Sequence, residues 1–337
     1  MIIAVDAAGG DYAPHEVVKG AVTAAQEFGV EIALVGRRNV LHVLTGRSSR
    51  EEAISIVDAS QVIDYHEPPI KALQSKPDSS IVVGINLLKS GGAAAFVSAG
   101  NTGAVVAASL LTLGKAKGVS RPAIGCFLDT LSSVPPLLVD AGANSDCRAK
   151  HLLEFARLGS LYSKNILKIS SPRVGLLSNG TEDGKGNRLV HETYKILKKA
   201  KDINFVGNIE GHDIINRTVD VIVTDGFTGN IVLKTFEGLS NNFLTSVRQI
   251  GRVFSSTSSV RGRDLMRDIG LDSWIEKMDY TEYGGACLLG INGNVIIAHG
   301  RSKARAIKNA IGLAKETVER SITEIVEEEN DEQTSGD

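Results

Sequence analysis

The chain passes repeatedly from a short, apolar, β-branched run through a glycine-rich turn into an amphipathic segment. These turns occupy residues 7–14, 99–103, 141–146, 179–187 and 225–230. Glycine accounts for 35 of 337 residues, well above the average of about 7%. Alternation of this kind indicates βαβ units and a mostly parallel sheet with helices on both faces. We therefore predict a three-layer α/β/α fold with all five turns at the carboxyl edge of the sheet, where ligands bind.

A chain of 337 residues can bury one large core or two modest lobes. We predict a single α/β/α domain over residues 1–326. At about residues 238–280 the pattern changes to two helices joined by a polar run, which indicates a helical excursion protruding from the sheet domain. Residues 327–337 have the acidic, non-aromatic composition of a disordered tail.

One uncharged stretch, between Lys89 and Lys115, is long enough to span a bilayer. It contains the sequence SAGNTG at residues 98–103, which would place glycines and an Asn at the bilayer centre. A buried strand at about 94–98 followed by a buried helix at about 102–114 fits the stretch better. The amino terminus also lacks the basic region of a signal peptide.

The formal net charge of −2 argues against general nucleic-acid binding, which needs a basic surface. The three cysteines, Cys126, Cys147 and Cys287, have no CxxC spacing. We predict that they are buried small hydrophobic residues in a reducing compartment rather than metal, disulfide or redox groups.

Several familiar catalytic motifs are absent from the sequence: the GxSxG elbow, HExxH, GxGxxG and the P-loop. We therefore expect no nucleotide cofactor. Three carboxylates that end predicted strands, Asp6, Asp140 and Asp225, could form a metal cluster. Helix capping and turn formation explain them better, and we expect no metal ion.

The turns are suited to binding anions. A glycine-rich turn that opens a helix directs free backbone N–H groups and the positive end of the helix dipole at one point. Lys185 is flanked by glycines in one turn, and Asn101, Asn187 and Asn230 add amide donors. A solvated loop lysine and helix-capping asparagines remain the alternatives. Because phosphate is already largely dianionic near neutral pH, such an edge could promote its attack on a thioester through positioning and oxyanion stabilisation.

The turns also carry specific motifs. They are DAAGGDYAP at 6–14, SAGNTGA at 98–104, DAGANSD at 140–146, KGN at 185–187, DGFTGN at 225–230, EYGGA at 282–286 and IAHG at 297–300. In this order they resemble the motifs of the PlsX family, from residue 2 to about residue 320. Ala8 stands where the family usually has Met, and Cys287 where Pro is common.

The resemblance implies a fold similar to isopropylmalate dehydrogenases and phosphotransacetylases. It also implies an enzyme that reversibly transfers a long-chain fatty acyl group from acyl carrier protein to inorganic phosphate, forming acyl-phosphate for phospholipid synthesis. Carried over by motif, Lys185 and Asn230 are the catalytic candidates, holding the phosphate and the thioester oxygen. The implied substrate- and phosphate-binding residues are Asn101, Thr102, Gly103, Asn187, Asp225, Gly226 and Gly229.

Acyl carrier protein is acidic, so its docking site should be basic. The candidates are Arg301, Lys303, Arg305 and Lys308, together with Arg261 and Arg263 in the predicted excursion. A solvated helix face would explain either cluster equally well.

The family further implies a cytoplasmic homodimer that supplies a membrane-bound glycerol-3-phosphate acyltransferase. The tip of the excursion reads SSTSSVRGRDL. Because it is polar, we expect at most weak, charge-driven contact with the inner face of the membrane.

Two other functions stay open. A phosphotransacetylase would run the same chemistry on acyl-CoA, so the preferred acyl donor separates it from the first interpretation. A non-catalytic scaffold would gather lipid-synthesis proteins at the membrane and would keep its function after Lys185→Ala.

Overall fold

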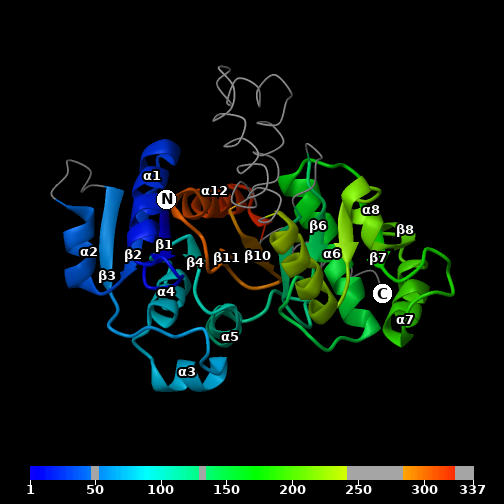
Figure 1. The fold of residues 1–337 in the computed structure, drawn as a ribbon, viewed down its shortest axis with the longest axis horizontal. Coiled ribbons are helices and arrows are strands. Elements are labelled where there is room, and N and C mark those ends of the chain that lie inside the picture. Colours follow the sequence, from blue (N-terminus) through cyan, green and yellow to red (C-terminus); the bar gives the residue numbers. More distant parts are fainter. Residues whose placement is uncertain (47–52, 129–133, 241–283, 323–337) are drawn as a thin grey trace, which may run out of the picture. The chain divides into compact units, whose positions relative to one another are not determined.

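The computed structural model describes residues 1–46, 53–128, 134–240 and 284–322 (Figure 1). The chain divides into two compact units. Unit 1 comprises Met1–Cys126, Leu161–Ile169 and Tyr283–Asp337, and unit 2 comprises Phe127–Ser160 and Ser170–Glu282. A single domain over 1–326 therefore stays a prediction. The predicted excursion beyond residue 240, with Arg261 and Arg263, and the predicted tail lie outside the described residues.

The sheet of unit 1 is mostly parallel. Its strands, in spatial order, are β3 (Ile54–Asp58), β2 (Glu31–Gly36), β1 (Ile2–Asp6), β4 (Ala95–Ser98), β11 (Asn294–Ile297), β10 (Ala286–Leu289) and β5 (Ala123–Phe127). Among the described strands of this unit, β10 alone runs antiparallel to its neighbours, β11 and β5. β1 and β4 are buried almost throughout, because a parallel strand covered on both faces consists of continuous apolar residues.

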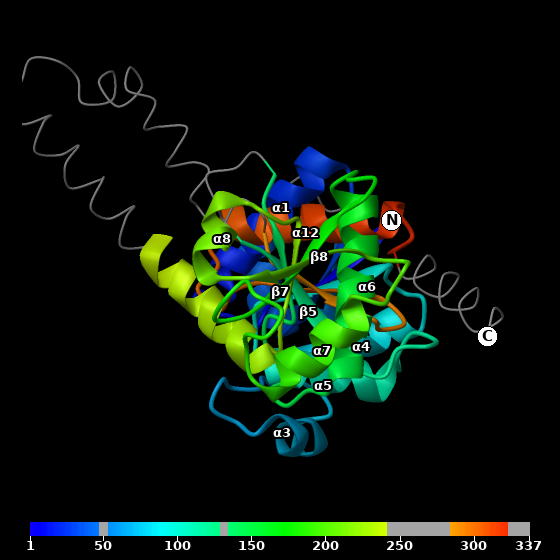
Figure 2. The same cartoon turned by 90° about the vertical axis from the view of Figure 1, so that its right-hand side faces the viewer.

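Helices cover both faces of this sheet. They are α1 (His15–Phe28), α2 (Arg38–Thr45), α3 (Pro69–Ser75), α4 (Ser80–Lys89), α5 (Thr102–Thr112) and α12 (Ala304–Glu319). α1 packs against α12 on one face, and α4 packs against α5 on the other (Figures 1 and 2). The α1–α12 contact is close because it uses glycine: a Cβ on Gly20 would lie 2.8 Å from the Cβ of Ile307.

The strands of unit 2 run parallel to one another. Its strands, in spatial order, are β6 (Leu137–Val139), β9 (Val221–Val223), β7 (Arg173–Leu177) and β8 (Asn204–Ile209). Its helices are α6 (Ala149–Ile166, of which 161–166 belong to unit 1), α7 (Arg188–Leu197), α8 (Gly211–Asn216) and a helix that begins at residue 226 and is described to residue 240.

The predicted fold class, a mostly parallel α/β sheet with flanking helices, is confirmed. The uncharged stretch forms β4 and α5, as the sequence indicates, and among the described residues no helix is long and apolar enough to cross a membrane. The prediction for the cysteines is only partly right. Cys287 is buried, but Cys126 and Cys147 are each partly exposed to solvent, because they lie at a strand position and in a turn that the core does not fully cover.

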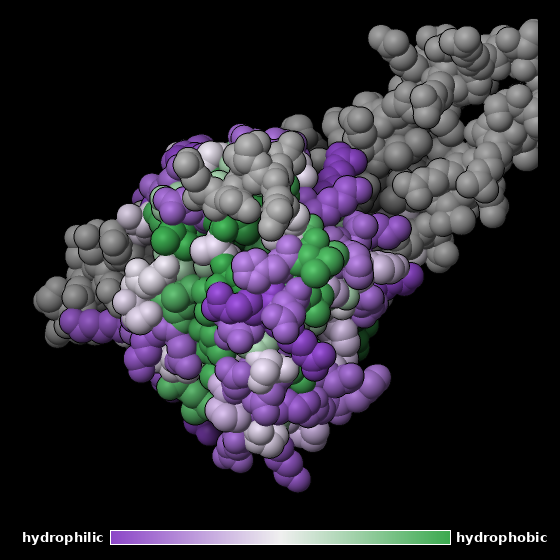
Figure 3. Space-filling view, turned by 90° about the vertical axis from the view of Figure 1, so that its left-hand side faces the viewer, coloured by the Kyte–Doolittle hydropathy of each residue, from purple (hydrophilic) through white to green (hydrophobic). Residues whose placement is uncertain are grey.

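Polar and apolar residues are interspersed on the face of unit 1 that carries α2 and β3 (Figure 3). The exposed large apolar side chains in this part of the chain include Val40 and Val43, both on α2. Some exposed apolar side chains are normal for a folded protein, and these two valines do not by themselves mark a binding surface.

Candidate active site

The first glycine-rich turn of unit 1 is built around Asp6, the last residue of β1. Its buried carboxylate accepts the backbone N–H groups of Ala8 (3.1 Å) and Gly9 (3.0 Å) and the hydroxyl of Ser98 (2.6 Å). Burial raises the pKa of the Asp6 carboxyl, and these hydrogen bonds oppose the rise. Asp6 therefore shapes the turn, which is the structural role that its sequence position predicts.

Three turns of unit 1 come together at the carboxyl end of its parallel strands. A Cβ on Gly9 would lie 2.7 Å from the backbone N of Gly100, so the first two turns approach as closely as two backbones can. The N–H of Asp11 donates to the carbonyl of Gly300 (2.8 Å), which joins the turn after β11. Three separate motifs of the sequence thus share one edge of the sheet.

Asn101 is the N-cap of α5. Its Oδ1 accepts the N–H of Ala104 (3.0 Å), and its Nδ2 donates to the carbonyl of Asp64 (3.0 Å) and, at 3.3 Å, to those of Tyr65 and Glu67. The amide of Asn101 is therefore committed to holding the 64–67 loop against α5. Thr102 and Gly103, in the first turn of this helix, are exposed and remain open to a ligand.

Tyr65 is a functional candidate that the sequence reasoning did not single out. Its hydroxyl donates to the carbonyl of Ala99 (2.6 Å), inside the turn between β4 and α5. Burial, followed by the charges of Asp11, Asp6 and Asp64, raises the pKa of Tyr65 to about 12. The hydroxyl therefore stays protonated at neutral pH and keeps its hydrogen bond to the Ala99 carbonyl. No local signal reveals this contact, because the two residues are 34 positions apart.

In unit 2 the turn after β6 is built around Asp140. This fully buried carboxylate accepts the backbone N–H groups of Gly142 (3.0 Å), Ala143 (2.9 Å) and Asn144 (2.7 Å), and the Nδ2 of Asn144 (2.8 Å). So many hydrogen bonds explain its burial without a metal ion. Within the described residues, no group of three or more His, Cys, Asp or Glu is arranged to hold one.

The turn after β9 lies directly against the Asp140 turn. A Cβ on Gly229 would be 1.9 Å from the carbonyl oxygen of Asp140, and a Cβ on Gly226 would be 2.8 Å from Asn144. Asp225 caps the helix that begins at residue 226, since its carboxylate accepts the N–H and the hydroxyl of Thr228, both at 2.9 Å. Gly226, Gly229 and Asp225 therefore position the turn.

Asn230 lies in the first turns of this helix and is exposed. Its side chain is next to Gly142, whose Cβ would be 3.6 Å from Oδ1 of Asn230. The Asn230 amide is therefore exposed where the turns after β6 and β9 pack together. Asn230 is one of the two catalytic candidates in this unit.

Lys185, the other candidate, lies in the 179–187 turn between β7 and α7 and is exposed. Its N–H donates to the carbonyl of Glu182 (3.0 Å), and its aliphatic stem lies over Gly180, where a Cβ would be 2.7 Å from Cγ. Asn187 caps α7 by accepting the N–H of Val190 (3.0 Å). The structure thus places Lys185 and Asn187 around the start of a helix.

The candidate docking residues of unit 1 lie at the start of α12. Arg301, Lys303 and Arg305 are exposed, and Lys303 lies 5.5 Å from the ring centre of Tyr12. Lys308 is paired with Glu27 at 2.7 Å, so its charge is partly neutralised. This end of α12 thus carries three exposed basic residues.

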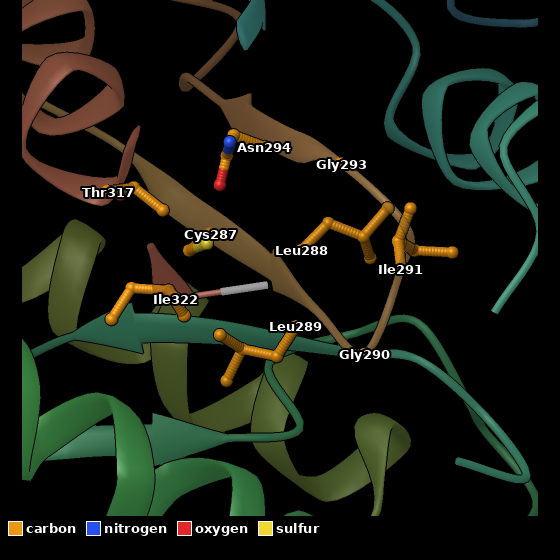
Figure 4. A pocket seen from close by; sticks show the side chains of 9 residues that line it. All are labelled: Cys287, Leu288, Leu289, Gly290, Ile291, Gly293, Asn294, Thr317 and Ile322. Atoms are coloured by element: carbon orange, nitrogen blue, oxygen red, sulfur yellow. The ribbon is translucent and has the colours of Figure 1, made fainter. Parts of the chain in front are cut away.

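A small hollow in unit 1 lies apart from these turns, beside the β10–β11 hairpin (Figure 4). It is lined by Cys287, Leu288, Leu289, Gly290, Ile291, Gly293, Asn294, Thr317 and Ile322. Burial raises the pKa of the Cys287 thiol to about 12, so the thiolate that a nucleophile requires is not formed at neutral pH.

Glycine-rich turns at the carboxyl ends of parallel strands, with helices on both sides of the sheet, define an α/β protein of the phosphotransacylase fold. A solved phosphotransacetylase from Streptococcus pyogenes has this fold, with a TM-score of 0.61, 18% identity and 94% of each chain covered. Residues 1–325 match the family described as "Fatty acid synthesis protein".

Curated relatives extend the match over nearly the whole length. The phosphate acyltransferase of Dehalococcoides mccartyi is 53% identical over 329 residues, covering 98% of this chain and 94% of the relative. The phosphate acyltransferase of Desulforamulus reducens is 48% identical over 332 residues, covering 98% of each. The chain belongs to this family of acyltransferases of fatty acid synthesis, and the resemblance to PlsX proteins is confirmed.

Proposed function

We propose that this chain transfers a long-chain fatty acyl group from acyl carrier protein to inorganic phosphate, releasing the carrier thiol and acyl-phosphate. The observation that carries the proposal is the 53% identity, over 98% of the chain, to a protein named phosphate acyltransferase. The exposed positions of Lys185 and Asn230 support it, because each can reach an anionic ligand.

In the proposed reaction a phosphate oxygen attacks the thioester carbonyl carbon, and a tetrahedral oxyanion forms. The C–S bond then breaks, and the carrier leaves as a thiolate that takes a proton from solvent. The Lys185 ammonium holds the phosphate, and the Asn230 amide donates to the developing oxyanion. Since dianionic phosphate needs no general base, positioning and electrostatic stabilisation are sufficient.

For the acidic carrier we propose a dock at the start of α12, formed by Arg301, Lys303 and Arg305, with Lys308 at its margin. Their exposure supports this assignment. Arg261 and Arg263 remain a second candidate dock. We further propose a cytoplasmic homodimer with at most weak contact with the inner membrane face, which passes its product to a membrane-bound glycerol-3-phosphate acyltransferase.

The test starts from acyl carrier protein that is loaded with a long-chain acyl group. It measures the release of free carrier protein with and without inorganic phosphate. An acyl-CoA reaction runs alongside. The expected result is phosphate-dependent release, with acyl-phosphate formed in equal amount and acyl-CoA inert. Release from acyl-CoA alone would instead identify a phosphotransacetylase, and no release with either donor would favour a scaffold.

A further inference from the structure

The turn that carries Lys185 contains several glycines and is mostly exposed. Gly186 has a φ of +105°, a conformation that other residues rarely adopt, and a Cβ on Gly184 would meet nothing within 4 Å. The turn packs closely at Gly180, beneath the Lys185 stem, and at Gly186, next to Val190, but residues 181–185 are exposed. The hydrogen bonds that connect this exposed part to the sheet and to α7 therefore help to decide where Lys185 lies.

One tie runs to α7. The Asp183 carboxylate accepts hydrogen bonds from the Lys198 ammonium (2.8 Å) and the Tyr194 hydroxyl, which together lower the pKa of Asp183. The Lys198–Asp183 ion pair is exposed, with 62% and 66% of the two side chains accessible. Exposed pairs of this type contribute little to stability, so this tie is weak.

The other tie runs to β8 and is buried. Asn208 is 6% exposed, and its Nδ2 donates to the carbonyl of Glu182 at 3.0 Å. The N–H of Lys185 donates to the same carbonyl, also at 3.0 Å. Asn208 sits in a paired position of the sheet, opposite Leu176. The Asn208 amide, on strand β8, therefore fixes the Glu182 carbonyl oxygen. The same oxygen accepts the backbone N–H of Lys185.

The asparagine is not explained by stability alone. Its Oδ1 is buried and has no hydrogen-bond partner within the described residues, and a buried unpaired acceptor is unfavourable. A leucine of similar shape would remove that cost, although the Glu182 carbonyl would lose the Nδ2 donor. Asn208 is therefore best explained by its Nδ2, which donates to the Glu182 carbonyl.

We propose that Asn208 is a positioning residue, which acts through the Glu182 carbonyl to hold Lys185 where it binds phosphate. The inference rests on the proposed function for the role of Lys185, but not for the restraint of the turn. Without the Asn208 amide, the turn samples other conformations and the ammonium leaves its productive position. Misplacement of a catalytic group by about 1 Å can lower turnover by about a hundredfold.

The test compares Asn208→Leu and Asn208→Ser with Asn204→Ala, in the full-length protein. Asn204 is a matched control because it lies on the same strand and its Nδ2 also donates to a backbone carbonyl, that of Ser171 (3.3 Å). The first readout is hydrogen exchange of residues 179–187, which needs no substrate. We expect faster exchange in both Asn208 variants and wild-type exchange in Asn204→Ala.

The second readout is the rate of phosphate-dependent release, alone and combined with Lys185→Ala. Asn208→Leu should lower kcat/KM for phosphate by about tenfold or more and cause no further loss in the Lys185→Ala background. Unchanged exchange in the turn would overturn the inference, and so would losses that multiply in the double variant. If Asn208→Leu does not fold, both readouts are taken from Asn208→Ser instead. A wild-type protein without phosphate-dependent release would refute the proposed function. The hydrogen-exchange result would still test whether Asn208 restrains the turn, because that readout needs no substrate.

Discussion

Gly142 lies against Asn230: a Cβ built on the glycine would be 3.5 Å from the Cβ of the asparagine. The glycine has a φ of +144°. The added methyl would make only ordinary van der Waals contact with Asn230, so the effect comes from φ. We expect Gly142→Ala to strain the turn by about 1–3 kcal/mol and its relaxation to shift Asn230, so that kcat falls more than thermal stability would suggest. Gly211→Ala, at the start of α8, is the control, because its Cβ would meet nothing within 4 Å. Equal kinetics in the two variants would show that the contact has no role in catalysis.

Lys185→Ala should lower kcat/KM for phosphate by about a hundredfold, because the phosphate loses the group that holds it in position for attack. Lys195→Ala, which removes an exposed lysine from α7, should leave kcat/KM for phosphate unchanged. Phosphate-dependent release of acyl carrier protein measures both. A folded Lys185→Ala protein with near-wild-type turnover would refute the assignment.

Tyr65 predicts a dependence of stability on alkaline pH. Its pKa is raised to about 12, above the usual value of 10.0. A group whose pKa is higher in the folded state contributes stability that is fully present below the unfolded pKa. That contribution is lost as the pH rises through the folded pKa, here between about 10 and 12. Tyr65→Phe should be less stable at pH 8 by about 1 kcal/mol, and the difference should shrink above pH 10 in denaturant titrations.

The pair Arg173–Asp220 predicts a dependence in the acid range. Burial alone acts to raise the pKa of Asp220, but the hydrogen bonds and charge of Arg173 outweigh it, so the pKa is lowered. This contribution to stability is therefore present above the unfolded pKa and is lost as the pH falls through the folded pKa. Arg173→Met should cost about 1–3 kcal/mol at pH 7 by leaving a buried carboxylate short of donors, and less below pH 4.

For a control, Arg188→Met removes an exposed pair with Glu192 and should change stability by less than about 0.5 kcal/mol. A cost that is equal at pH 7 and pH 4 would mean that Arg173 acts through packing rather than charge. Urea unfolding followed by circular dichroism distinguishes these outcomes.

The order of elements was predictable because its signals are local. The sequence HEVVKGAVTAAQEF forms α1 over His15–Phe28, and the turn after β4 begins α5 at Thr102. Asp6 and Asp140 build turns, as residues of that type at the ends of strands usually do. Each of these inferences needed only a few neighbouring residues.

What escaped prediction depends on distant contacts. Nothing local places β11 between β4 and β10, or shows that the Asn101 amide is already occupied by the 64–67 loop. The Tyr65 hydroxyl and the Asn208 amide act on turns far along the chain. Exposure of Cys126 and Cys147 was mispredicted for the same reason, since composition does not reveal which side chains the core leaves uncovered.

The place of β10 and β11 between β4 and β5 has a consequence during synthesis. When the ribosome has synthesised about the first 280 residues, strands β1 to β5 are complete. β10 and β11, which lie between β4 and β5 in the sheet, have not yet been made. Until they emerge, both inner strands present unpaired edges, which are templates for association with other chains. A transcript truncated before the codon for Ile297 should therefore yield aggregated protein rather than a shorter enzyme.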